Sequence, residues 1–152
     1  MMTVQSTSRP TPSTLLRWTL QVDGLSTALM GIMMAAGARP TASFLGLDSP
    51  LALAVIGLVL AMHGIVLFTG ANRERVDPRL AWYAIGGNVA WLVGSAIILL
   101  TDVLPLSVAG WWAVAVVADL VTIFVVLQFI GLRRQEANFS LNRVHEPVTH
   151  HQ

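Results

Sequence analysis

LALAVIGLVLAMHGIVLFTG, residues 51–70, is an apolar stretch whose one strongly polar side chain is His63. Three more stretches of similar character, at residues 15–37, 80–100 and 108–132, fill most of the 152-residue chain. The hydrocarbon core of a bilayer is about 30 Å thick, and a helix needs about 20 apolar residues to cross it. The sequence therefore predicts an all-α fold, a four-helix transmembrane bundle.

The composition agrees with a membrane protein and excludes several function classes. Hydrophobic residues make up 55% of the chain and charged residues 11%, whereas a soluble domain has about 25% charged residues. The chain has no cysteine, which excludes thiolate nucleophiles, disulfide exchange and iron–sulfur ligation. Residues 1–14 and 133–152 are polar. We expect the first segment to be a disordered tail and the second to be a polar tail that could begin as an extension of the fourth helix.

The basic residues predict the orientation in the membrane. All nine are arginines. Arg39 alone falls on one side of the predicted bundle, and the others flank the opposite ends of the helices, at positions 9, 17, 73, 75, 79, 133, 134 and 143. The positive-inside rule places both termini and the middle loop in the cytoplasm. Because the orientation explains these scattered arginines, we expect no nucleic-acid partner.

Small residues recur at helical spacing in the first two spans. Such seams let helices pack closely in lipid, where close packing replaces the hydrophobic effect. The seams consist of Gly24, Ala28, Gly31 and Ala35 in the first span, and of Ala54, Gly57, Ala61 and Gly64 in the second. We therefore expect one compact bundle.

Each span carries one strongly polar residue in its interior. Asp23, His63 and Asn88 lie at a common depth, about 10 to 12 Å from the cytoplasmic ends of their spans at 1.5 Å per residue. Asp119 lies deeper, about 20 Å from its cytoplasmic end by the same rise. It can join this layer only if Thr122, one turn closer to the cytoplasm, bridges the gap.

The layer has two interpretations. In the first, Asp23 and His63 form a protonatable pair, steadied by Asn88 and assisted by Ser26 and Thr27, that binds a proton, a cation or a polar headgroup. In the second, the same side chains only hydrogen-bond the helices together. Ionisable residues inside a membrane are costly and are enriched at functional sites, so both interpretations stay open.

Metal and cofactor binding have weaker signals. His63, followed by Gly64, could be an axial ligand to haem or to a chlorophyll-type pigment whose ring lies over the glycine, with Asp23 or Asn88 orienting the imidazole. The tail residues His145, Glu146, His150 and His151 carry metal-binding atoms, but a solvated tail is the simpler interpretation. We therefore expect no bound metal and no cofactor.

LLRWTLQVDGLSTALMGI, GGNVAWLVGSAIILL and VVLQFIGLRR, from the first, third and fourth spans, resemble segments of small, uncharacterised four-span bacterial membrane proteins. The shared features are an acid early in the first span and an Asn-x-x-Trp in the third. The resemblance implies a multi-pass protein of the bacterial cytoplasmic membrane. The segment around Asp23 is also faintly similar to the first helix of small multidrug resistance transporters, although the longer spans and strong arginine bias depart from that family.

No catalytic motif accompanies these residues, so we expect a protein that is not an enzyme. The sequence favours an accessory or assembly subunit of a larger bacterial membrane complex, in contact with lipid and with other subunits or a second copy. The alternative is a small proton-linked transporter, or a polar-ligand-binding membrane protein, that uses the Asp/His/Asn layer.

Overall fold

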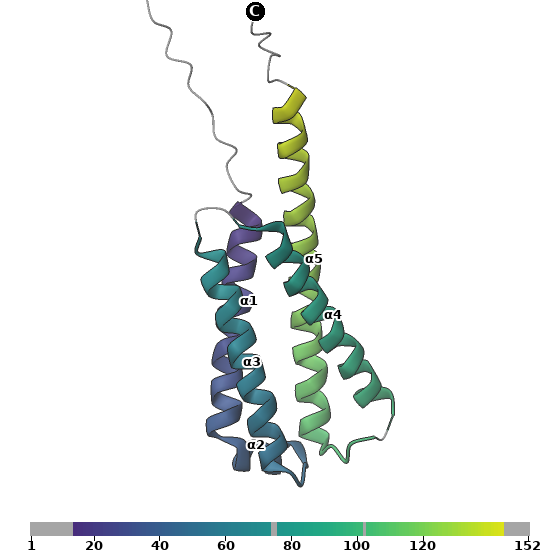
Figure 1. Cartoon of the computed structure of the whole chain (residues 1–152). Coiled ribbons are helices and arrows are strands. Elements are labelled where there is room, and N and C mark those ends of the chain that lie inside the picture. Colours follow the sequence, from purple (N-terminus) through teal and green to yellow (C-terminus); the bar gives the residue numbers. More distant parts are fainter. Residues whose placement is uncertain (1–13, 74–75, 102, 145–152) are drawn as a thin grey trace, which may run out of the picture.

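The computed structural model describes residues 14–73, 76–101 and 103–144 (Figure 1). The described part is all-α and contains no strand. Its helices are α1 (Thr14–Ala36), α2 (Ala38–Leu45), α3 (Pro50–Ala71), α4 (Pro78–Leu100) and α5 (Val108–Val144). The four long helices begin and end within about two residues of the predicted spans, except at the end of α5.

Proline and a capping side chain set the start of two long helices. Pro50 and Pro78 occupy the first turns of α3 and α4, where a missing backbone N–H costs nothing. The Ser49 hydroxyl accepts from the Ala52 N–H at 3.3 Å, and the Asp77 carboxylate accepts from the Arg79 N–H at 2.8 Å. The two prolines thus mark the starts of α3 and α4.

The segment between the first two predicted spans, residues 38–50, contains a short helix, α2. Pro40 lies in its first turn, where it breaks no hydrogen bond. Gly46 ends the helix in the left-handed region, with φ of 82°, a conformation that glycine adopts freely. A side chain here would also collide with the Ser107 backbone, since a Cβ on Gly46 would lie 2.6 Å from the Ser107 nitrogen.

The polar segment that follows the fourth predicted span begins as an extension of that helix, because α5 continues through residues 133–144 as a single helix of 37 residues. The segment RRQEANFSLNRV contains neither proline nor glycine, so no residue breaks the helix where the apolar stretch ends. The rest of this tail and residues 1–13 of the predicted N-terminal tail lie outside the described residues.

Three helices in the described part are long and apolar enough to cross a membrane: Pro50–Ala71, Pro78–Leu100 and Val108–Ala137. The chain is therefore a helical protein with candidate transmembrane helices. α1 is not among them although it has 23 residues. Gln21, Asp23, Ser26 and Thr27 lie in its middle and reduce its hydropathy.

The helices pack as two pairs. α1 and α3 run antiparallel in close contact, and α5 packs against both α1 and α4 (Figure 1). The apolar core lies near the α3–α4 connection and includes Leu16, Leu20, Leu67 and Leu132, each at most 1% exposed. α3 and α4 contact each other little, so the two pairs diverge away from this core.

The predicted small-residue seams form the α1–α3 contact. A Cβ added to Gly24 would lie 2.8 Å from the Gly64 carbonyl oxygen, and one added to Gly57 would lie 2.7 Å from the Gly31 carbonyl oxygen. Real Cβ atoms do not approach a backbone oxygen so closely, so only glycine fits at these positions. This close backbone approach fixes the register of α1 on α3.

Candidate functional site

The Asp23 carboxylate is the centre of a buried hydrogen-bond network. Its Oδ2 accepts from Asn88 Nδ2 at 2.8 Å and from Gln128 Nε2 at 2.6 Å. Asn88 Nδ2 also donates to Gln128 Oε1 at 3.3 Å. The three side chains come from α1, α4 and α5 and are 1%, 6% and 0% exposed. The network therefore joins three helices at one depth.

Ser26 and Thr27, about one helical turn after Asp23 on α1, have different hydrogen-bond acceptors. The Thr27 hydroxyl donates to Asp23 Oδ1 at 3.3 Å, as expected for a residue one helical turn away. The Ser26 hydroxyl donates to the Asp23 backbone carbonyl at 3.0 Å instead. Ser26 is exposed, so it belongs to the outer surface of α1 rather than to the site.

The Asp23 carboxylate accepts hydrogen bonds from neutral side chains only. Its hydrogen-bond partners are two side-chain amides and one hydroxyl, and no described residue forms an ion pair with it. An acidic group buried without partners would be strongly destabilising. Here each oxygen of the Asp23 carboxylate accepts at least one hydrogen bond. These bonds fix the position of the carboxylate and connect α1 to α4 and α5.

The predicted Asp23–His63 pair does not form a hydrogen bond. His63 Nδ1 instead lies 2.9 Å from the Tyr83 hydroxyl, and the two rings have centroids 5.0 Å apart. A Cβ on Gly87 would lie 2.8 Å from His63 Cε1, so this glycine makes room for the imidazole against α4. The rotation of α3 that seats its glycines on α1 brings His63 against Tyr83 and Gly87 of α4.

Two predicted members of the layer face outward. Asp119 and Thr122 are both exposed, and the Thr122 hydroxyl donates to the Ala118 carbonyl of its own helix at 2.9 Å. Thr122 therefore does not bridge Asp119 to the layer, contrary to that expectation. Instead Gln128 enters the network; its position near the cytoplasmic end of the fourth span is compatible by sequence both with the polar layer and with the solvated membrane interface. Its spacing of nine residues from Asp119 puts the two side chains on different faces of α5.

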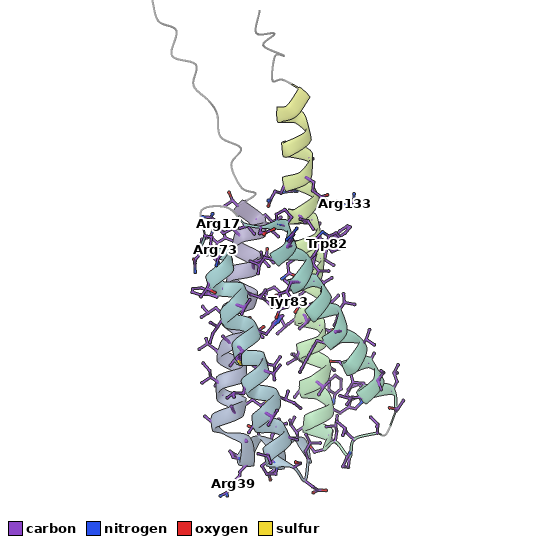
Figure 2. The ribbon with its side chains drawn as sticks, in the orientation of Figure 1. Arg17, Arg39, Arg73, Trp82, Tyr83 and Arg133 are labelled. Carbon is purple, nitrogen blue, oxygen red and sulfur yellow. The ribbon has the colours of Figure 1, made fainter. Side chains whose placement is uncertain are left out.

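A groove runs between the two helix pairs, with a cavity volume of about 700 Å³. Its lining comes from α1, α3, α4 and α5 and is mainly apolar. The polar members are His63, Tyr83, Asn88, Ser95 and Thr27, together with the indole of Trp91. Figure 2 places Tyr83 between the α1–α3 pair and the α4–α5 pair. The groove thus passes beside the Asp23 network, with Asn88 common to both.

The predicted pigment geometry at His63 does not fit the structure. A Cβ on Gly64 would lie 2.5 Å from the Gly24 carbonyl oxygen, so α1 covers the surface on which a haem or chlorophyll-type ring would lie. The described residues also contain no cluster of three or more metal-binding side chains. The tail residues His145, Glu146, His150 and His151 lie outside the described residues.

Comparisons with known proteins leave the chain without an identified family. No protein-family model matches the sequence, and no curated protein or solved structure shows a significant similarity to it. The function must therefore be argued from the geometry above.

Proposed function

We propose that this chain is a multi-pass protein of the bacterial cytoplasmic membrane with four membrane-spanning helices. These are the three candidate spans in α3, α4 and α5, together with α1. α1 is as long as α4, 23 residues, and lies along α3. Its most polar group, Asp23, is turned into the bundle and hydrogen-bonded, so it does not face lipid. This inward placement is what allows a helix of low hydropathy to cross a bilayer.

The arginines support an orientation with both termini in the cytoplasm. Arg17, Arg73 and Arg133 lie at one end of the bundle and Arg39 at the other (Figure 2). The Arg17 guanidinium also donates to the Arg73 carbonyl at 2.7 Å, which holds the start of α1 beside the end of α3. The positive-inside rule assigns the arginine-rich end to the cytoplasm.

Within this frame, we propose that the protein is a non-catalytic accessory or assembly subunit of a larger membrane complex. The observation that carries this proposal is the exposed Asp119, which lies near the middle of the apolar part of α5, residues 108–132. It is surrounded on the same outer surface by Val116, Leu120 and Ile123, which are 55%, 51% and 55% exposed. An acid facing lipid at the centre of a span costs about 2.5 to 3.5 kcal/mol. A partner helix that offers a hydrogen-bond donor at this depth removes the cost.

The test is purification from native membranes in a mild detergent. We expect the unmodified chain to retain a partner subunit and Asp119→Leu to lose it while remaining folded. Asp48→Leu is the matched control, since it removes an exposed acid outside the spans. A partner retained equally by Asp119→Leu, or an unmodified chain that purifies alone, would refute the subunit proposal.

The alternative, a proton-linked transporter built on the layer, has less support. Transport would require Asp23 to exchange its partners for a proton or cation. Its oxygens instead accept from Asn88, Gln128 and Thr27 in a site that is almost inaccessible. A fixed, saturated carboxylate suits a structural hydrogen bond between helices better than a carrier site.

A further inference from the structure

The groove between α3 and α4 is separate from the Asp119 surface and is graded along its length. His63 and Tyr83 line it toward the α3–α4 connection, whereas Ile98 and Val114 line its other end. Along α4, the ten residues from Asn88 to Ile98 span about 15 Å at the rise of a helix. The groove is therefore more polar at the end near His63 and Tyr83 and mainly apolar at the other end, where Ser95 is a polar side chain close to Ile98.

The lining contains no arginine, aspartate or glutamate. A charged headgroup would lose its hydration in this groove without gaining a counter-ion, which is strongly unfavourable. The polar end also lies deep: His63 is eight residues before the end of α3 at Ala71, about 12 Å at 1.5 Å per residue. Phospholipid headgroups lie outside the hydrocarbon region, so the depth and charge both favour a neutral ligand head.

Two nitrogen atoms of the lining have no hydrogen-bond partner among the described residues. His63 Nδ1 uses the Tyr83 hydroxyl. When this hydroxyl donates, the neutral imidazole carries its proton on Nε2, which is then a donor. The Trp91 indole N–H is a buried donor without an acceptor in the described part, and Trp91 is one of the residues that line the groove. Both positions call for an acceptor such as a carbonyl oxygen.

We propose that this groove binds a neutral, single-tailed amphiphile of the isoprenoid-quinone class. A ring carbonyl accepts from His63 and Trp91, and the ring packs against the aromatic side chains. The tail follows the apolar end past Gly94, where an added Cβ would meet nothing within 4 Å. The ligand enters from the bilayer, because the rim residues Val59 and Met62 are 61% and 65% exposed. The volume of about 700 Å³ lies within the usual range for ligand sites, about 300 to 1,000 Å³.

The test uses decylubiquinone, a benzoquinone with one alkyl tail, titrated calorimetrically into the full chain in phosphatidylcholine nanodiscs, with empty nanodiscs as the blank. Gly94→Leu fills the groove and should weaken binding about tenfold or more. Gly86→Leu is the matched control: its added side chain also meets open space, but Gly86 is outside the groove lining, so affinity should not change. His63→Phe and Tyr83→Phe should each weaken binding about threefold to tenfold, the value of one hydrogen bond.

Three results would overturn the proposal. Equal binding by Gly94→Leu and the unmodified chain would place the quinone outside the groove. Equal affinity for decylbenzene, which has the tail but no carbonyl, would show that the polar end recognises nothing. Tighter binding of dodecyl phosphate would show that the ligand head is anionic. None of these measurements involves Asp119 or a partner subunit, so their failure leaves the subunit proposal standing.

Discussion

The two aspartates within the long helices have opposite environments. Asp23 is 1% exposed and accepts hydrogen bonds from three side chains, whereas Asp119 is exposed among apolar residues. Burial with saturated hydrogen bonds makes a polar group part of the fold. Exposure toward lipid makes it a group that needs a partner from outside. Because both residues are aspartates, the different roles of Asp23 and Asp119 follow from the way α1 and α5 are rotated in the bundle.

Gln128 provides a test of the network at the level of one side chain. Replacing Gln128 by leucine removes one of the two amide donors to Asp23 Oδ2 in a fully buried site. We expect the free energy of unfolding in detergent micelles to fall by about 1 to 3 kcal/mol. Gln21→Leu is the control, because the Gln21 amide also bonds another helix, at Asn72, but at an exposed position. If Gln21→Leu lowered the free energy of unfolding as much as Gln128→Leu, burial would not explain the effect of the Gln128 hydrogen bond.

At the level of helices, the sequence predicts where each span lies better than which way it faces. The seam of small residues in α1 and α3 marks their contact surface, and the structure places Gly24 against Gly64 accordingly. Apart from Asp119, Thr122 and Gln128, the span at residues 108–132 is apolar on every side, so no apolar stripe distinguishes the inner face of α5. For this reason the sequence leaves open whether Gln128 joins the polar layer or lies at the solvated membrane interface, and it does not place Asp119 on the outer surface. The His63–Tyr83 contact was equally unpredictable, because it depends on how α3 rotates to fit α1.

Glycine-to-alanine exchanges test the α1–α3 contact. Gly57→Ala places a Cβ 2.7 Å from the Gly31 carbonyl oxygen, which forces the two helices apart. We expect a loss of about 1 to 3 kcal/mol in the free energy of unfolding, the usual cost of overpacking. Gly86→Ala, in open space on α4, should change it little. Unaltered stability of Gly57→Ala in the same denaturation experiment would mean that the helices do not approach this closely.

At the level of the whole molecule, length and composition predict the class, and packing explains the one span that hydropathy alone does not identify. Three helices are apolar enough to cross a membrane. The proposed fourth, α1, depends on turning Asp23 toward Asn88 and Gln128. The proposed topology therefore follows from tertiary contacts, which a sequence window of any length does not contain.

Single-cysteine labelling tests this topology cleanly, because the chain has no cysteine of its own. In intact cells, an impermeant maleimide should label Asp48→Cys and Val103→Cys. Thr14→Cys and Asn72→Cys should be labelled only after the cytoplasmic membrane is permeabilised. All four positions are exposed. If α1 did not cross the bilayer, Thr14→Cys and Asp48→Cys would be labelled from the same side.

The most direct test of the account compares Asp23→Leu with Asp119→Leu in one measurement, the free energy of unfolding of the isolated chain in detergent. We predict that Asp23→Leu lowers it by about 2 to 3 kcal/mol, since the amides of Asn88 and Gln128 lose their buried acceptor. Asp23→Asn, which keeps one acceptor oxygen, should lose less. Asp119→Leu should stay within about 0.5 kcal/mol of the unmodified chain, as exposed substitutions do. Equal losses for the two leucine variants, or full stability of Asp23→Leu, would contradict the division of the two acids into an inner structural group and an outer binding group.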